Sequence, residues 1–213
     1  MTYTTDASAG TPSLPRLSVA NLAATRVRAA LKAGYHSARN LPDRVLHSRR
    51  HIAACRRLSR IARPQSLLVV CHGNICRSPY LHAVLQRAFS DVAISSAGFI
   101  GRGRPVPVLS LQVSARRGID LSGFRSQPLT PENVRRADLI IVMDAGQAHY
   151  IERAFGVRPE RLMIAGDLDP VKSPTRAIRD PWMQSVDVFE SSFDRLDRCA
   201  AILVATLNHR PGS

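Results

Sequence analysis

Short apolar runs alternate with amphipathic segments from residue 65 to the end of the chain. The run Ser66–Val70 is continuous and rich in Leu and Val, which is typical of a strand buried on both faces. Similar runs predict further strands at residues 92–96, 139–143 and 162–165. Apolar positions at helical spacing predict helices over residues 79–89, 107–117, 131–136, 145–155 and 186–207. This alternation predicts an α/β fold in three layers, with a four-stranded parallel sheet flanked by helices.

Residues 1–64 differ in character from the domain expected over residues 65–213, and we expect them to form a basic N-terminal extension. Residues 1–15 are rich in Thr, Ser, Ala and Pro, which is typical of a disordered segment. Residues 16–63 are rich in Ala, Leu and Arg and predict a helical pair. The two helices are expected at residues 17–38 and 43–62, on either side of a break near Asn40-Leu41-Pro42.

Most of the excess positive charge lies in this extension. Of 30 Lys and Arg residues, 12 fall within residues 1–64, together with 2 of the 16 acidic residues, so this part has a net charge of +10. Such a segment is suited to anionic partners, and residues 16–63 are candidates to contact nucleic acid or an anionic membrane face. Three other interpretations stay open: a helical pair docked on the domain, an organelle transit peptide, or residues encoded upstream of the true start codon.

Hydropathy and cysteine usage indicate the compartment. No apolar run approaches the roughly 18 residues that span a bilayer, and residues 1–15 lack the apolar core of a signal peptide. We therefore expect a cytoplasmic protein. In that compartment Cys55, Cys71, Cys76 and Cys199 are expected to be free thiols, and their spacing is not that of a zinc site.

The segment that carries most chemistry is Val70-Cys-His-Gly-Asn-Ile-Cys-Arg-Ser-Pro79, which runs from the first strand of the domain into its first helix. The chain must turn tightly there, and Gly73 can adopt positive φ freely while Asn74 tolerates it. Ser78 is a good N-cap and Pro79 a good first helical residue. Such a loop directs successive backbone N–H groups inward, so with the helix N-terminus it forms a cradle for a dianion.

Cys71 lies at the bottom of this cradle, where the amides and the helix dipole favour its nucleophilic thiolate. Arg77, six residues further on, can return to the same point and clamp two phosphate oxygens with its planar guanidinium. Ser78 can donate its hydroxyl to the sulfur. A soft nucleophile, an amide nest and an arginine around one phosphorus predict phosphoryl transfer. The alternative is that Cys71 is a buried packing residue.

The run from Cys71 to Arg77 fits the C-x5-R signature of cysteine-based phosphatases, and the longer C-x-G-N-x-C-R-S-P resembles the low-molecular-weight protein-tyrosine phosphatase family. The resemblance covers roughly residues 65–209. It implies hydrolysis of phosphotyrosine and other aryl phosphomonoesters through a cysteinyl-phosphate intermediate, with no metal and no cofactor. It also implies that the phosphate is bound by the loop residues His72, Gly73, Asn74, Ile75, Cys76 and Ser78.

Expulsion of a phenolate, whose conjugate acid has a pKa of ~10, needs a proton donor. Asp180-Pro181-Trp182 is similar to the D-P-aromatic motif that carries the general acid of the family, so the resemblance gives this role to Asp180. Trp182 offers a flat face for an aryl phosphate. The alternative for Asp180 is a turn-forming Asp before Pro. Asp167 and Asp169 are rival acids, and Asp144 is expected to be structural.

Two further roles rest on the resemblance alone. Ser96 would hydrogen-bond with Asn74 and Ser78 and so support the loop. Cys76 matches a second cysteine that can form a disulfide with the nucleophile and protect it from over-oxidation. The alternative for Cys76 is a residue in the wall of the loop.

The chain departs from the family pattern around the pocket. It has His82 where Glu is frequent and Phe124 where His is frequent. Many members have an aromatic wall where Phe99 is available here. Arg102 and Arg104 follow in the same loop, and they either favour acidic sequence around the phosphotyrosine or belong to a solvated surface loop.

Asp180-Pro-Trp together with Ser185 and Phe189 resembles the bacterial branch linked to tyrosine kinases of surface polysaccharide export. The expected partner is therefore a phosphotyrosine protein, either a tyrosine autokinase or its substrate. One alternative is an arsenate reductase on the same fold, which would need further cysteines such as Cys55 or Cys199 to resolve its adduct. Another is a binding protein that combines a phosphate site with the basic arm of residues 16–63.

Overall fold

The computed structural model describes residues 41–208, which belong to one compact unit. The disorder predicted for residues 1–15 and the helix predicted for residues 17–38 lie outside the described residues. Four parallel strands form a single sheet in the order β2-β1-β3-β4. The strands are β1 (Ser66–Cys71), β2 (Ala93–Gly98), β3 (Leu139–Val142) and β4 (Leu162–Ile164). The predicted fold class is thus confirmed, and each strand boundary lies within two residues of its prediction.

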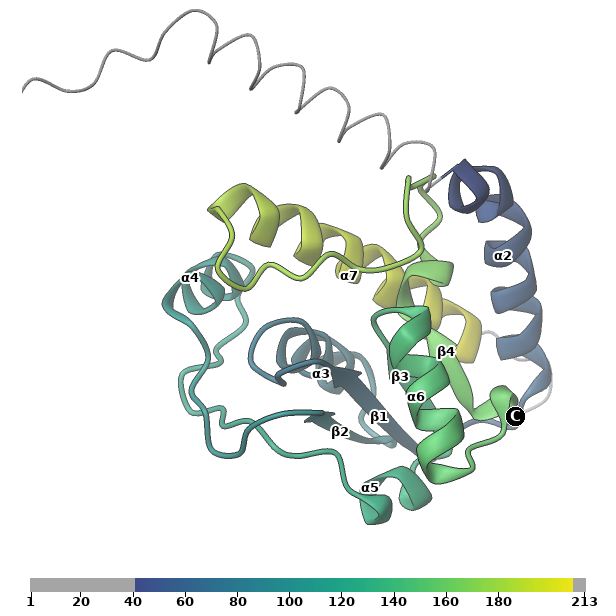
Figure 1. Ribbon diagram of the computed structural model, residues 1–213, viewed down its shortest axis with the longest axis horizontal. Coiled ribbons are helices and arrows are strands. Elements are labelled where there is room, and N and C mark those ends of the chain that lie inside the picture. Colours follow the sequence, from purple (N-terminus) through teal and green to yellow (C-terminus); the bar gives the residue numbers. More distant parts are fainter. Residues whose placement is uncertain (1–40, 209–213) are drawn as a thin grey trace, which may run out of the picture. The chain divides into compact units, whose positions relative to one another are not determined.

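Helices cover both faces of this sheet (Figure 1). They are α2 (Leu41–Arg60), α3 (Arg77–Ala88), α4 (Val108–Arg116), α5 (Pro131–Arg136), α6 (Ala145–Phe155) and α7 (Val186–Asn208), with short 3-10 turns η1 (Pro159–Arg161) and η2 (Ala165–Leu168). On one face α3 contacts β1 and β2, and α7 packs against α3. On the other face α5 contacts β1, and α6 contacts β3 and β4. The molecule is therefore three layers deep.

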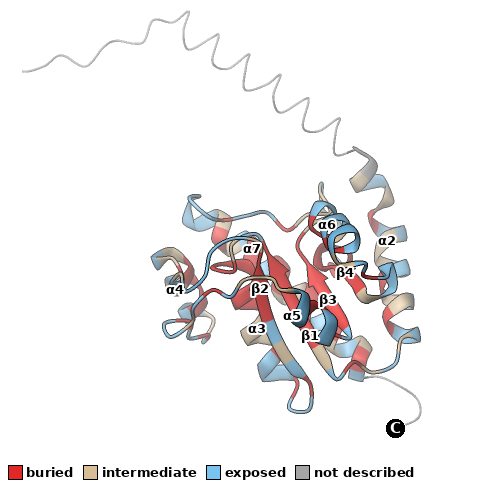
Figure 2. Ribbon diagram, turned by 60° about the horizontal axis from the view of Figure 1, so that its bottom comes forward, coloured by how far each residue is buried: buried red, intermediate tan, exposed pale blue. Residues whose placement is uncertain are grey.

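Alternating side chains of the strands form two hydrophobic cores, one on each face of the sheet. Leu67 and Val69 of β1 join the core under α3 and α7. Leu68 and Val70 join the smaller core under α5 and α6. Both sets are fully buried, which explains why β1 reads as an unbroken apolar run (Figure 2).

The second helix predicted for the basic extension is α2, and it packs against α7 and η2. Ala54 and Leu58 point inward and belong to the core under α3 and α7, with Leu58 0% exposed. On the same side the Arg57 guanidinium donates to the carbonyl oxygens of Pro159 and Leu162. The composition of the chain changes at residue 64, but the packed unit does not begin there, because it includes α2.

No helix in the described part of the chain is both long and apolar enough to cross a membrane.

Truncation of Leu58 measures what the packing of α2 contributes to stability. Because this side chain is 0% exposed, Leu58→Ala leaves a cavity, and we expect the free energy of unfolding to fall by about 2–5 kcal/mol. Urea denaturation followed by circular dichroism gives this value. The matched control is Val45→Ala on the same helix, 66% exposed, which we expect to cost less than about 0.5 kcal/mol. Equal effects of the two variants would contradict the packing of α2.

Candidate active site

The site lies where β1 ends between two parallel neighbours, β2 and β3. This is the position at which the strand order reverses, and ligands of open α/β sheets bind beyond the carboxyl ends of the strands there. Cys71 is the last residue of β1 and is in register with Gly98, the last residue of β2. A Cβ at Gly98 would lie 2.7 Å from the backbone nitrogen of Asn74. The loop after β1 can therefore sit directly on the end of β2 only because residue 98 is glycine.

Asn74 holds this loop in shape from its interior. It is fully buried and adopts a left-handed conformation, with φ 49°. Its side-chain amide donates to Ser78 Oγ at 2.8 Å and to Ser96 Oγ at 3.0 Å, so the implied link between Ser96 and Ser78 runs through Asn74. Its Oδ1 accepts from the backbone N–H of Gln127 at 2.7 Å, a contact that the sequence did not indicate.

The expectation that Gly73 would supply positive φ is wrong, since only Asn74 in this loop has it. The buried amide compensates for the strain of that conformation with three side-chain hydrogen bonds. A Cβ placed at Gly73 would lie 3.3 Å from Arg104 Nη1, the far end of a flexible side chain.

The Cys71 sulfur accepts two hydrogen bonds. One comes from the Asn74 backbone N–H at 3.2 Å and the other from the Ser78 hydroxyl at 3.0 Å. Both donors stabilise negative charge on the sulfur, whether as nucleophile or as leaving group. The expectation that Ser78 would be an N-cap is wrong, because α3 begins at Arg77 and the Ser78 hydroxyl is engaged by Cys71 and Asn74.

Arg77 is buried and connects the loop to the segment that carries Asp180. Its Nη1 donates to the Ile178 carbonyl oxygen at 3.0 Å, and its Nη2 pairs with the Asp180 carboxylate. The Ile178 N–H in turn donates to the Met143 carbonyl oxygen at 2.9 Å, which ties this segment to the end of β3. The structure thus brings the predicted arginine and the predicted acid into direct contact.

Asp180 is the most accessible of the candidate acids, with 44% of its side chain exposed. Its Oδ1 accepts from the Trp182 backbone N–H at 3.2 Å, so the turn predicted as an alternative is also present. The Trp182 side chain is half exposed and lines the cavity above Cys71. The acid and the aromatic wall are therefore fixed by one turn.

The rival carboxylates are engaged elsewhere. Asp167 accepts two hydrogen bonds from the Arg176 guanidinium, from Nε at 2.7 Å and from Nη2 at 2.6 Å. Asp169 is buried, which opposes its ionisation, yet hydrogen bonds from Arg198 and the charge of Arg195 hold its pKa below the usual value. Asp144 caps α6 by accepting from the Gln147 N–H at 2.8 Å, so its expected structural role is confirmed.

Two cavities meet at this site. The one above Cys71 has a volume of about 70 Å³ and is lined by Cys71, His72, Gly73, Ile75, Cys76, Arg77, Ile100, Arg104, Asp180 and Trp182. An open groove of about 680 Å³ adjoins it, shares His72, Arg77 and Asp180, and is walled by Phe99 and Tyr150. The ring centroids of these two aromatic side chains are 5.2 Å apart, in a T-shaped arrangement.

The expectation for Phe99 therefore needs correction. Phe99 walls the groove, and Ile100 takes the corresponding place in the cavity above Cys71. Asn74 and Ser78 were expected among the phosphate-binding residues, but neither side chain lines the cavity, because both are buried and hydrogen-bonded to each other behind the loop. Ser96 joins them there, in the supporting position expected for it.

All four cysteines are free thiols. Cys76 is buried in the wall of the cavity, and its burial together with the charge of Cys71 raises its pKa to about 12. Cys199 is buried in α7, which raises its pKa to about 12 as well. Cys55 lies on α2, where burial raises its pKa. Within residues 41–208, no group of three or more His, Cys, Asp or Glu side chains is placed to hold a metal ion.

Comparisons with known proteins point to one family. The model of a family described as low molecular weight phosphotyrosine protein phosphatase matches residues 66–211. The probable low molecular weight protein-tyrosine-phosphatase EpsP of Ralstonia nicotianae is 36% identical over 136 residues, which are 63% of this chain and 90% of EpsP. The low molecular weight protein-tyrosine-phosphatase Etp of Escherichia coli K12 is 34% identical over 139 residues, 63% of this chain and 89% of Etp.

Solved structures show the same fold. The tyrosine phosphatase amsI of Erwinia amylovora superposes with a TM-score of 0.65 at 30% identity, over 70% of this chain and 97% of amsI. The YwlE arginine phosphatase of Geobacillus stearothermophilus superposes with a TM-score of 0.61 at 25% identity, over 70% of this chain and 100% of YwlE. One fold thus carries phosphatases whose names specify two different phosphorylated side chains.

Thiol alkylation tests the different environments of the cysteines. At pH 8 we expect iodoacetate to modify Cys71 first, because its sulfur lies in the cavity and accepts two hydrogen bonds. Cys76 and Cys199 have pKa values of about 12, so they remain protonated and unreactive until the pH approaches that value. Mass mapping of the modified peptides gives the order. Inorganic phosphate should slow the reaction at Cys71 only, and faster labelling of Cys76 than of Cys71 would contradict this view of the loop.

Proposed function

The chain belongs to the low molecular weight phosphotyrosine protein phosphatase family, and from this premise we propose that it hydrolyses phosphotyrosine through a phosphate ester formed on Cys71. The observation that carries the proposal is the Cys71 sulfur with two hydrogen-bond donors, in one cavity with Arg77 and Asp180. Nucleophile, cation and acid are the three groups that transfer of a phosphoryl group from a phenol requires.

In the first step the Cys71 thiolate attacks the phosphorus in line with the leaving oxygen. The S–P bond forms as the P–O bond breaks, and Asp180 gives its proton to the departing phenolic oxygen. Arg77 exchanges its contact with Asp180 for two equatorial oxygens of the phosphoryl group. The loop amides and the N-terminus of α3 stabilise the remaining charge.

In the second step Asp180, now ionised, accepts a proton from water while the water oxygen attacks the phosphorus. The S–P bond breaks, inorganic phosphate leaves, and the thiolate returns to the hydrogen bonds of Asn74 and Ser78. The first step needs Cys71 ionised and Asp180 protonated, and the second needs Asp180 ionised. The guanidinium and the amides supply the electrostatics, and we expect activity to persist in EDTA.

The lining of the cavity favours an aryl phosphate in a protein partner. Trp182 is half exposed beside the cavity and can stack on a phenol ring. Arg104, from the segment after β2, also lines the cavity and can pair with an acidic residue near the phosphotyrosine. A tyrosine autokinase or its substrate, in the cytoplasm, remains the predicted source of that phosphotyrosine.

Hydrolysis of three substrates tests the reaction and its specificity together: p-nitrophenyl phosphate, a phosphotyrosine peptide and a phosphoarginine peptide. For Cys71→Ser we expect a loss on the order of 10⁴-fold or more. For Asp180→Asn we expect about 10²- to 10⁴-fold on the phosphotyrosine peptide. Phosphate release is the measurement, and Asp144→Asn is the control carboxylate.

A preference for phosphoarginine would replace the proposed substrate but keep the nucleophile. Full activity of Cys71→Ser would overturn the mechanism. If the folded protein releases no phosphate but oxidises a thiol donor in the presence of arsenate, the chain is an arsenate reductase.

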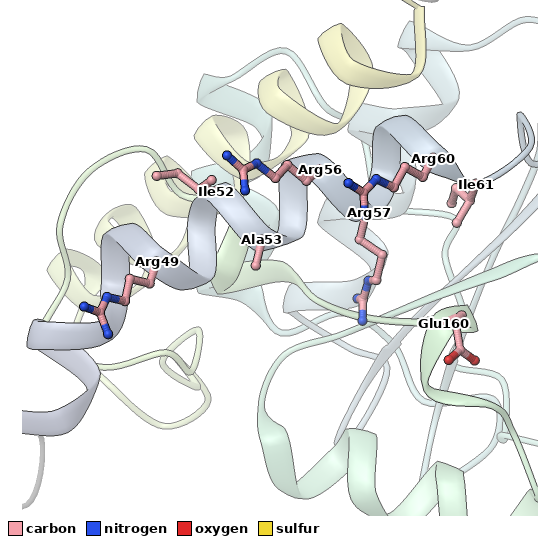
Figure 3. Close-up of a pocket in the computed structure, with 8 residues that line it drawn as sticks. All are labelled: Arg49, Ile52, Ala53, Arg56, Arg57, Arg60, Ile61 and Glu160. Carbon is pink, nitrogen blue, oxygen red and sulfur yellow. The ribbon is translucent and has the colours of Figure 1, made fainter.

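A second candidate function, contact with an anionic membrane surface, is favoured by the outward face of α2. Figure 3 shows Arg49, Arg56 and Arg60 projecting from this helix, while Arg57 turns toward the domain. These three arginines are exposed, and no carboxylate within residues 41–208 forms an ion pair with them. The groove beside them has a volume of about 690 Å³ and contains one acid, Glu160.

Apolar side chains distinguish a bilayer from nucleic acid as the partner. Val45 is 66% and Ile52 49% exposed on the same face as Arg49 and Arg56. Guanidinium groups interleaved with aliphatic side chains suit the headgroup region of a membrane. No Phe, Tyr or Trp occurs between residues 41 and 60 to stack on bases.

Sedimentation with anionic vesicles tests this face. For the triple variant Arg49→Gln, Arg56→Gln, Arg60→Gln we expect about fivefold weaker binding per arginine. The matched control is Arg135→Gln, Arg153→Gln, Arg158→Gln, which removes the same charge from exposed positions on other elements. Equal losses in both variants would indicate attraction by net charge alone. Binding to duplex DNA but to no vesicle would favour nucleic acid.

A further inference from the structure

The acid-bearing segment has little regular structure of its own. Residues 169–185, between η2 and α7, form no helix or strand, and Asp180 stands within them. In Figure 1 the loop that precedes α7 passes close to the N-terminal end of α2. The contacts that hold this loop therefore determine the position of Asp180.

One anchor comes from α2. Asp43, in the first turn of α2, accepts the backbone N–H of Arg176 at 3.0 Å. Burial opposes ionisation of Asp43, but this hydrogen bond and the pairing with Arg50 hold its pKa below the usual value. The Arg176 side chain donates two hydrogen bonds to Asp167. Both the backbone and the side chain of Arg176 are therefore fixed.

Each residue from Arg176 to Asp180 is then tied to a neighbouring element. The Ala177 carbonyl accepts from Arg195 at 2.8 Å, and the Arg179 carbonyl accepts from the Ser192 hydroxyl at 3.0 Å. Ile178 is held on both sides by Met143 and Arg77. Asp43 holds the first residue of this series. Within residues 41–208 it is the one hydrogen-bond partner of the series that lies outside the region matched by the family, residues 66–211.

We propose that α2 is a built-in support of the active site, in which Asp43 acts as a positioning residue for the loop that presents Asp180. The inference rests on the proposed function, since it assumes that Asp180 donates the proton. Asp43 touches neither substrate nor the reacting atoms. Its loss lets the Arg176 end of the loop move, and Asp180 then meets the leaving oxygen less often.

The dependence of the hydrolysis rate on the leaving group distinguishes this positioning role from an effect on the stability of the fold. A nitrophenolate leaves with little help, whereas an unsubstituted phenolate, of conjugate-acid pKa ~10, needs the proton. A misplaced acid therefore slows hydrolysis of phenyl phosphate more than that of p-nitrophenyl phosphate. A loss of folded protein lowers both rates equally.

The experiment measures kcat/KM of the full chain on both substrates, because kcat/KM reports the step in which the phenol leaves. The value of kcat also contains hydrolysis of the cysteinyl phosphate, in which Asp180 acts as base and which is the same for both substrates. For Asp43→Ala we expect kcat/KM on phenyl phosphate to fall about tenfold, part of the general-acid contribution, and kcat/KM on p-nitrophenyl phosphate less than about twofold. Asp43→Asn keeps an acceptor oxygen for the Arg176 N–H and should restore most of the loss. Asp91→Ala, which also breaks a surface ion pair with an arginine, is the matched control and should leave the ratio of the two rates unchanged.

A double-mutant cycle with Asp180→Asn completes the test. Asp43→Ala should have no further effect on either substrate when Asp180 is already Asn. An equal loss on both substrates, or the same added loss in the Asp180→Asn background, would overturn the positioning role. If Asp180→Asn alone slows both substrates equally, Asp180 is not the general acid. This outcome tests the proposed function by itself, whatever the effect of Asp43→Ala.

Discussion

The seating of the loop after β1 on the end of β2 is the contact on which the site depends. A Cβ at Gly98 would meet the Asn74 nitrogen at 2.7 Å, so any other residue there would push the loop away from the sheet. Asn74 occupies the space that remains, and its buried amide links the loop to Ser78 and Ser96. The orientation of the Cys71 sulfur follows, because its two donors belong to this same network.

The opposite wall of the cavity is fixed by charge instead of by regular structure. Asp169 is buried between Arg195 and Arg198, and Arg195 also reaches the carbonyls of Thr175 and Ala177. Loss of one partner would leave an uncompensated buried charge, so these pairs strongly favour a single arrangement of the loop. A segment without helix or strand can therefore hold Asp180 at a defined place.

The sequence was informative where the signal is local. The apolar run of β1, the spacing of Cys71 and Arg77, and the Asp-Pro-Trp turn are contiguous, and the structure places all of them at one edge of the sheet. The hydrogen bonds from Gln127 to Asn74 and from Ile178 to Met143 were not foreseen, nor was it foreseen that Asn74 and not Gly73 would adopt the positive φ. Each depends on how segments distant in the chain pack together, and no pattern within one segment records that packing.

Helix α2 carries two different constraints on its two sides. Its inner side must match the domain, because Leu58 is fully buried and Asp43 accepts a specific backbone N–H. Its outer side has no such restriction, and arginines with exposed Ile52 and Val45 accumulate there. Because Arg50 and Arg57 are engaged inward while Arg49, Arg56 and Arg60 are not, an anionic surface can neutralise the outer row without competing for the contacts of the inner one. Attachment and turnover would then be separable properties of the same helix.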